Sequence, residues 1–89
     1  MNPNTQAVIE QLTPIARDLF RIYPTTGVDA DDLRWHAVQE GVLTGVPSTV
    51  LPSVLTGALK AAGGKATSET RKSMSPSAKG RRVLIWRLA

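Results

Sequence analysis

The sequence contains no cysteine and only one histidine, His36. Without cysteine there is neither a disulfide framework nor a thiolate metal site, which fits a reducing compartment and predicts a cytoplasmic protein. A lone histidine on a helix is usually a surface or structural residue, and no thiol is present to act as a nucleophile. The glycines form neither a phosphate-binding loop nor a dinucleotide fingerprint. We therefore expect no enzymatic activity, no cofactor and no metal.

Long apolar runs are also missing, although 42% of the residues are hydrophobic, an ordinary share for a globular protein. The longest runs are a few residues, whereas roughly 20 are needed to span a bilayer. The N-terminus has neither the basic start nor the continuous apolar stretch of a signal peptide. A chain this short has no apolar material for a second core. We expect one domain over residues 1–89 and no membrane association.

Lysine does not occur before residue 60, and the charge is divided unevenly along the chain. Residues 1–59 hold three arginines and six acidic residues, a net charge of −3, whereas residues 60–89 hold eight Lys or Arg and one Glu, a net charge of +7. A separation of this kind creates a directional field that attracts polyanions and raises their association rate. A nucleic acid is the polyanion that we expect.

The first predicted helix covers about residues 5–23. Its wide apolar face consists of Val8, Leu12, Ile15, Leu19 and Ile22, flanked by Ile9, Ala16, Phe20 and Tyr23. Pro14 interrupts this pattern, so we expect a kinked helix or two closely joined pieces. Pro24 ends the segment, because the residue before a proline is pushed out of helical geometry.

The second predicted helix covers about residues 30–40. Asp29 can cap it, and Asp31 and Asp32 in the first turn face the positive end of the helix dipole. Three aspartates in four positions could suggest a metal site, but capping explains them and no further ligand lies close by in the sequence. Gly41 supplies the left-handed stop. The residues expected to face inward are Leu33, Ala37 and either Trp35 or Val38.

The third predicted helix covers about residues 50–62 and is closed by Gly63 and Gly64. Its buried face consists of Leu51, Val54, Leu55, Ala58, Leu59 and Ala62. Its outer face is small and polar and consists of Ser53, Thr56, Gly57 and Lys60. Glycine inside a helix costs roughly 1 kcal/mol against alanine. Gly57 therefore either admits a close neighbour, such as a DNA backbone, or is a neutral surface position.

The C-terminal part of the chain predicts a β-hairpin over about residues 65–88. Residues 65–72 are mostly polar, as in an edge strand, whereas residues 83–86 are apolar on both sides of the pleat, as in a strand between two neighbours. We expect the last strand to be central, with the edge strand on one side and a short stretch at Val28 on the other. Its face formed by Leu84, Trp86 and Leu88 is expected to pack on the helices.

This order of elements is that of a winged helix-turn-helix, an α+β fold with three helices, a small antiparallel sheet and a basic wing. The loop of the hairpin, residues 73–80, is longer than most hairpin loops, and long loops in small domains tend to be functional. The cations expected at its mouth are Arg71, Lys72, Lys79, Arg81 and Arg82. An alternative role for them is a solvated charged loop that prevents edge-to-edge aggregation.

Three stretches of the chain also resemble small winged-helix proteins encoded by bacteriophages and prophages. They are Val-Asp-Ala-Asp-Asp-Leu-Arg at 28–34, Ala-Leu-Lys-Ala-Ala-Gly at 58–63, and Arg-Lys-Ser-x-x-Pro-Ser-x-x-Gly-Arg-x-Val-x-Ile-Trp-Arg at 71–87. The resemblance implies a DNA-binding protein of phage type that acts in transcription regulation or as a replication or recombination accessory. The chain departs from strong DNA readers because its third helix offers no Arg, Asn or Gln on its outer face.

Double-stranded DNA is therefore the predicted partner. The residues expected to approach the major groove are Ser48, Thr49, Ser53, Thr56 and Lys60, and those expected to hold phosphates or the adjacent minor groove are Arg71, Lys72, Lys79, Arg81 and Arg82. The alternative is a protein-protein interaction module that binds a host or phage protein through the same surface, because Ser, Thr and Gly suit close protein packing equally well.

Other partners fit the sequence less well. Binding to RNA or to an anionic membrane is open to any basic hairpin, but we expect no exposed aromatic platform for stacking and no basic amphipathic helix. Many helix-turn-helix proteins dimerise to match two half-sites. A homodimer contact would form on the first helix if its apolar face is wider than one core needs.

Overall fold

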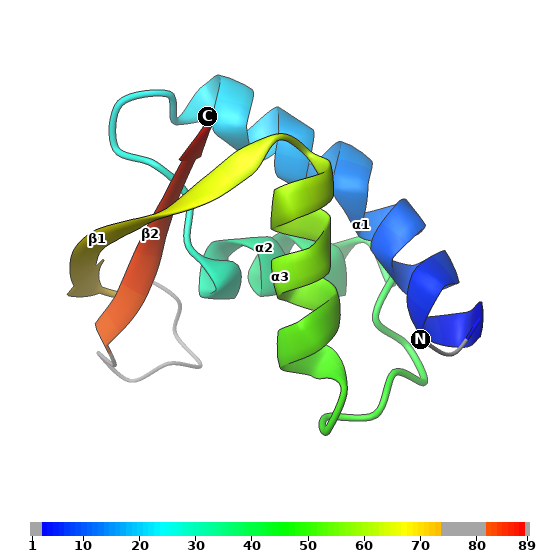
Figure 1. The fold of residues 1–89 in the computed structure, drawn as a ribbon. Helices are drawn as coiled ribbons and strands as arrows, with labels where there is room; N and C mark the ends of the chain where they lie inside the picture. The colour runs from blue at the N-terminus through cyan, green and yellow to red at the C-terminus, as the bar shows by residue number, and fades with distance from the viewer. Residues whose placement is uncertain (1–2, 74–81, 89) are drawn as a thin grey trace.

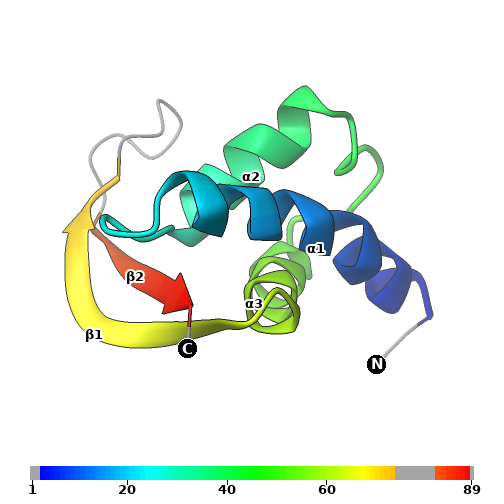
Figure 2. The same cartoon turned by 90° about the horizontal axis from the view of Figure 1, so that it is seen from above.

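The computed structural model describes residues 3–73 and 82–88, with side chains from Thr5 onward. Within these residues the chain forms three helices and then two antiparallel strands, which confirms the α+β class (Figure 1). The elements are α1 (Pro3–Ile22), α2 (Ala30–Gln39), α3 (Leu51–Ala61), β1 (Gly64–Lys72) and β2 (Arg82–Leu88). The three helices and the middle of β2 share one hydrophobic core (Figure 2). No helix in the described ranges is long and apolar enough to cross a membrane.

Helix α1 runs through Pro14 as one helix, so of the two predicted alternatives the closely joined pieces are wrong and the single helix over about residues 5–23 is confirmed. Pro14 has no N–H to donate to the carbonyl of Glu10. The side chain before it, that of Thr13, has a hydrogen-bond acceptor within the same helix, because its hydroxyl donates to the Ile9 carbonyl at 2.7 Å. The residues of α1 that belong to the core are Ile9, Leu12, Ala16, Leu19 and Phe20.

Ile22 does not join this core, although the apolar spacing placed it on the buried face. It is 60% exposed, whereas Phe20 is 2% exposed. Two residues separate the two side chains by about 200° around the helix axis. Because Phe20 fills the core at the last turn, Ile22 faces solvent. Val8 and Ile15 lie between these extremes and are partly buried.

Helix α2 has the caps that the sequence predicted. The Asp32 amide donates to the Asp29 carboxylate at 2.8 Å, and the Asp29 amide donates to the Asp32 carboxylate at 3.5 Å, which together form a capping box. At the other end, Gly41 has a φ of 74°. The amides of Gly41 and Val42 donate back to the last turn, so the helix ends in a Schellman motif.

Only the stripe that contains Leu33 and Ala37 faces the core in α2. Trp35 and Val38 are exposed, so the prediction that one of them faces inward is wrong. Trp35 lies two residues from both buried positions and therefore on another side of the helix. Its ring stands edge-on to that of His36 at a centroid distance of 5.6 Å. Trp35 and Tyr23 are each 43% exposed, which argues against the expectation that the chain has no exposed aromatic platform for stacking.

Helix α3 crosses α1, and Gly57 lies at the crossing. A Cβ atom on Gly57 would stand 2.8 Å from the Cδ1 atom of Ile9. The close neighbour of Gly57 is thus a side chain of the same protein, and the prediction that this glycine lies on the outer face is wrong. The rest of the predicted buried face of α3 is confirmed, since Val54, Leu55, Ala58, Leu59 and Ala62 are buried and Leu51 packs against them.

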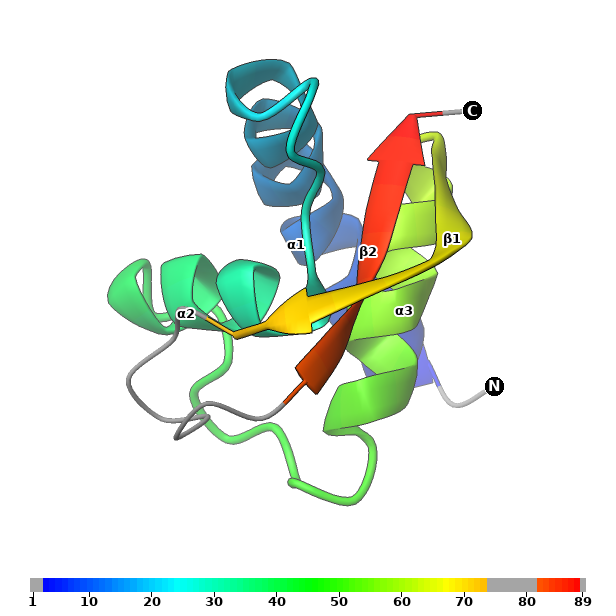
Figure 3. The ribbon, with the colours of Figure 1, turned by 90° about the vertical axis from the view of Figure 1, so that its left-hand side faces the viewer.

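The hairpin also has the predicted arrangement. Arg82 pairs with Lys72, Val83 with Arg71 and Leu84 with Thr70, and the register shifts between Ala66 and Thr70. Val28 forms a two-way bridge with Trp86, in which the Val28 amide donates at 2.8 Å and the Trp86 amide at 2.7 Å. Strand β2 therefore lies between β1 and the Val28 stretch, as expected (Figure 3).

The prediction that a whole face of β2 packs on the helices holds only at Trp86. Trp86 belongs to the core, whereas Leu84 and Leu88 are exposed. The Val28 bridge holds the middle of β2 against the helices, and the strand extends on both sides of that point. On the opposite face Ile85 is buried beside Gly27, where a Cβ atom would stand 2.5 Å from its Cγ2 atom. Gly27 has a φ of 78° and leaves no room for a side chain.

The contact between Gly57 and Ile9 can be tested by a double-mutant cycle. We expect Gly57→Ala to be more favourable in an Ile9→Val background than in the wild type, by at least about 0.5 kcal/mol, because Ile9→Val removes the Cδ1 atom that the new methyl group meets. The free energies of unfolding in urea measure this coupling. Equal effects of Gly57→Ala in both backgrounds would show that the two residues are not in contact.

Candidate nucleic-acid interface

The predicted groove-facing residues lie on one side of α3 and in the turn before it. Ser48, Thr49, Ser53 and Lys60 are exposed, and Thr56 is half-buried. The structure thus brings the five residues to the surface, but it adds no larger polar group beside them on α3. This face can approach a phosphate backbone closely and has few donors with which to read base edges.

The cations Lys72 and Arg82 lie directly opposite each other across the hairpin. Like charges in directly opposed positions of a sheet repel. The Arg82 guanidinium donates to the Thr70 hydroxyl and carbonyl at 3.1–3.3 Å, but these acceptors are neutral and leave its charge uncompensated. This end of the hairpin and the N-terminal end of α3 lie on the same side of the molecule (Figures 1 and 3). Lys79 and Arg81, also predicted to bind DNA, lie outside the described residues.

Arg71 has a different environment from the other predicted wing cations. Its guanidinium makes five hydrogen bonds within the protein. Nη1 donates to the Thr26 carbonyl at 2.9 Å and Nη2 to the Gly27 carbonyl at 3.2 Å. Nη2 also donates to the carboxylates of Asp29 at 3.2 Å and Asp32 at 2.9 Å, and Nε donates to Asp29 at 3.3 Å. The sequence grouped Arg71 with the phosphate contacts, whereas the structure joins it to the cap of α2.

Burial makes the pair between Arg71 and Asp29 important for stability. The Asp29 side chain is 1% exposed and the Arg71 side chain 27% exposed. A desolvated carboxylate requires donors in place of water, and Arg71 and the Asp32 amide supply them. Removing the cation leaves the charge of Asp29 buried without its partner.

We expect Arg71→Ala to lower the free energy of unfolding by about 3–5 kcal/mol, the typical cost of breaking a buried ion pair by removing one partner. Arg82→Ala is the matched control, because Arg82 is an exposed arginine on the paired strand, and its loss should change stability by no more than about 0.5 kcal/mol. Urea denaturation of the two variants measures the difference. Similar, small losses for both would contradict a stabilising role of Arg71.

Burial raises the pKa of the Asp32 carboxyl above its ordinary value of 3.8, and the nearby Asp29 carboxylate raises it further. The backbone hydrogen bond with Asp29 and the charge of Arg71 act in the opposite direction and do not outweigh these effects. Because the folded pKa is the higher one, the fold binds the Asp32 proton more tightly than the unfolded chain does. The stability due to this group is fully present below 3.8 and is lost as the pH rises through the folded pKa.

An NMR titration of the Asp32 carboxyl should therefore give a midpoint above 3.8. In an Arg71→Gln variant we expect the pKa to rise further, because the guanidinium that favours the ionised form is gone. A lower Asp32 pKa in the variant would contradict the ion pair.

The other arginine of the hairpin that is neutralised is Arg87. It forms an ion pair with Glu69 on β1, and its Nε donates to the Thr25 carbonyl at 3.2 Å. In the described part of residues 60–88, the cations without a carboxylate partner are Lys60, Lys65, Lys72 and Arg82. Lys65 was absent from the predicted set, although its position at the start of a basic strand could have indicated it.

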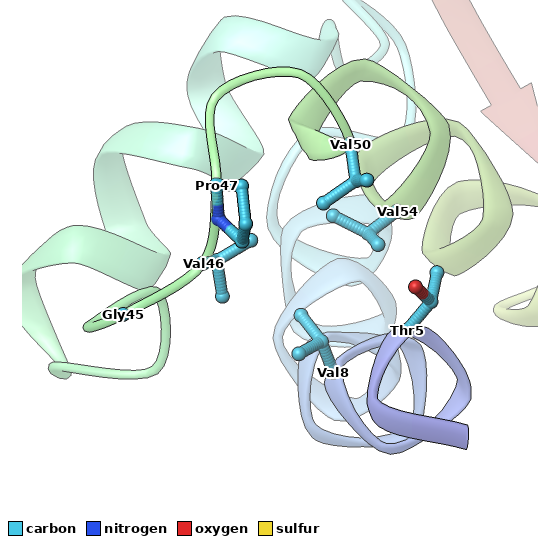
Figure 4. Close-up of a pocket in the computed structure, with 7 residues that line it drawn as sticks. All are labelled: Thr5, Val8, Gly45, Val46, Pro47, Val50 and Val54. Carbon is cyan, nitrogen blue, oxygen red and sulfur yellow. The ribbon is translucent and has the colours of Figure 1, made fainter. Parts of the chain in front are cut away.

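A small hollow of about 250 Å³ lies next to the turn before α3 (Figure 4). The N-terminal part of α1, the segment before α3 and the first turns of α3 enclose it. Its lining consists of Thr5, Val8, Gly45, Val46, Pro47, Val50 and Val54. This lining is mostly apolar and contains no titratable side chain, so it can accept an apolar group but offers no acid or base. Among the described residues, no group of three or more His, Cys, Asp or Glu could hold a metal ion.

A second surface feature lies between α1 and α2. It includes Ile22, which was expected to be buried, and Trp35, one of the two residues considered for an inward-facing position, and both are exposed. A hollow of about 260 Å³ is lined by Ile15, Asp18, Leu19, Ile22, Trp35, His36, Gln39 and Glu40. The apolar face of α1 is thus wider than the core covers. The sequence contained this signal, because the apolar face predicted for the first helix was wide.

Comparisons of the chain with protein-family models, with curated proteins and with solved structures gave no significant match.

Proposed function

We propose that this protein is a non-enzymatic module that binds double-stranded DNA as a winged helix. In this arrangement α2 and α3 form the helix-turn-helix, α3 faces the major groove, and the hairpin of β1 and β2 is the wing. The observation that supports it most is the pair of Lys72 and Arg82, two cations directly opposed across the hairpin with no described carboxylate to neutralise either. An external anion would remove their repulsion.

The order and pairing of the elements support the same proposal. The short stretch at Val28 pairs with β2 and so takes the place of a third strand beside the hairpin. The two helices after it, α2 and α3, are joined by a segment that contains Gly41 and Gly45. The N-terminal end of α3 and the Lys72–Arg82 end of the hairpin lie on one side of the molecule, so a single duplex can reach both (Figures 1 and 3).

Phosphate contacts supply most of the affinity in this proposal. The described contributors are Lys60, Lys65, Lys72 and Arg82, and the sequence adds Lys79 and Arg81. The hydroxyls of Ser48, Thr49, Ser53 and Thr56 donate to phosphates near the groove. Since α3 carries few groups that distinguish bases, sequence preference depends on DNA shape or on a partner. In the cell such a module serves as a phage-type transcription regulator or as a replication or recombination accessory.

Titration of a duplex at several salt concentrations tests the proposal. If four to six phosphates are neutralised, the logarithm of the association constant should fall with the logarithm of the salt concentration with a slope of about −4 to −5. Lys72→Ala and Arg82→Ala should each reduce the size of this slope by about 0.9. Arg17→Ala, on α1, is a matched control that should leave it unchanged. Absence of binding at low salt would refute the proposal.

A second candidate function is protein binding, and the exposed side chains of Ile22 and Trp35 favour it. Both line the hollow between α1 and α2. A large aromatic side chain beside exposed aliphatic groups is typical of interface hot spots. The same surface suits a homodimer contact. If the duplex titration shows no binding, while the protein still exerts its biological effect with Lys72 and Arg82 replaced by Ala, this candidate becomes the better one.

A further inference from the structure

Hydrogen bonds attach the hairpin to the rest of the described molecule at two places along its length, one at Trp86 and Arg87, where Arg87 Nε also donates to the Thr25 carbonyl, and one at Arg71. The first includes the backbone bridge between Val28 and Trp86, with hydrogen bonds of 2.7 and 2.8 Å. The second is the Arg71 side chain, which reaches the turn at Thr26 and Gly27 and the two carboxylates at the start of α2. A hairpin held at one point alone could pivot about it, whereas two points fix its direction.

The second attachment lies away from the first along the hairpin, so it resists rotation of the hairpin about the Val28–Trp86 bridge. Arg71 is paired with Val83, which lies three residues before Trp86 on β2. At about 3.3 Å per residue, the backbone of Arg71 lies roughly 10 Å along the hairpin from the bridge, and its side chain reaches back to Gly27 and Asp29 on either side of Val28. The next pair beyond Arg71 and Val83 is Lys72 with Arg82. The side chain that fixes the hairpin is therefore adjacent to the two cations assigned to DNA.

Nε and Nη2 of Arg71 are engaged by acceptors within the protein, and Nη1 donates one of its two N–H groups to the Thr26 carbonyl. A phosphate could accept the second N–H of Nη1, but a bidentate contact would have to displace carboxylates or backbone carbonyls. That exchange is unfavourable because the Asp29 side chain is almost fully buried and would lose its counter-charge. Arg71 is thus unsuited to the bidentate phosphate contact that arginine usually makes.

We propose that Arg71 is a positioning residue, which clamps the hairpin to the first turn of α2 and so holds Lys72 and Arg82 toward the DNA. This inference rests on the proposed DNA binding and extends it. The clamp makes the direction of the wing part of the folded structure, so that DNA binding does not have to order it. The residues of the clamp do not touch DNA themselves.

Asp32→Asn gives the sharpest test, because the clamp and simple electrostatics predict opposite signs. Removing a negative charge should tighten DNA binding if only the overall field matters. If the clamp positions the wing, the variant should bind more weakly, by about tenfold, because the Oδ2 atom that accepts from Arg71 loses its charge. The asparagine oxygen can still accept from both the Asp29 amide and Arg71, so the cap of α2 is kept. Tighter binding by Asp32→Asn would overturn the proposal.

Arg71→Gln and Arg82→Ala separate positioning from contact. Both changes remove one positive charge from the hairpin. We expect Arg82→Ala to reduce the salt slope by about 0.9, and Arg71→Gln to weaken binding at every salt concentration with the slope unchanged. An equal reduction of the slope in both variants would show that Arg71 contacts a phosphate. If Arg71→Gln does not fold, the sign of the change in DNA affinity of Asp32→Asn still decides between the clamp and simple electrostatics.

A measurement without DNA keeps this test separate from the proposed function. Residual dipolar couplings of the amides in β1 and β2, compared with those in the helices, report the direction of the hairpin. The clamp predicts that Asp32→Asn reduces or reorients the hairpin couplings and leaves those of α1 and α3 unchanged. If the wild-type protein does not bind DNA, the proposed function fails while these couplings still test the clamp. Unchanged hairpin couplings would refute the clamp in either case.

Discussion

The carboxylate of Asp29 is removed from water, and the arrangement of the C-terminal half of the fold depends on how this charge is satisfied. The amide of Asp32 donates to its Oδ1 atom and the guanidinium of Arg71 to its Oδ2 atom. One donor belongs to the first turn of α2 and the other to the hairpin. A single buried charge therefore caps a helix and attaches a sheet to that helix, two functions that separate residues would otherwise have to perform.

The same interaction changes how the charge of the protein should be understood. The sequence has a net charge of +7 over residues 60–89, and the sequence alone gives no reason to exclude any of these cations from contact with a polyanion. Among the described residues, Arg71 and Arg87 are paired with carboxylates, whereas Lys60, Lys65, Lys72 and Arg82 are not. The free positive charge is thus smaller than the sequence suggests, and its described part lies along the hairpin and at the C-terminal end of α3.

The glycines of α3 and β1 also have another role in the structure than the one that the sequence suggested. Gly57 in a polar stretch of α3 suggested a position where a ligand could come close, but the close neighbour is Ile9 of α1. At Gly64 a Cβ atom would collide with the Phe20 ring and the Leu59 carbonyl. These glycines let α1, α3 and β1 approach one another closely. In so small a domain, the space that these glycines leave is used for internal packing, and the outer face of α3 consists of the short polar side chains of Ser53 and Thr56 together with Lys60.

The sequence by itself determined the three helices, the hairpin and the central place of the last strand, because each depends on short-range signals. Capping aspartates, Gly41, Pro24 and the apolar spacing act within a few residues. The tertiary structure alone decided the neighbours of Gly57, the exposure of Trp35 and the partners of Arg71. Those partners lie 39 to 45 residues away in the sequence. The residues next to a cation in a basic stretch do not indicate which distant carboxylate it will pair with. Periodicity indicates which side of a helix is apolar, but the size of its neighbours decides how much of that side is covered.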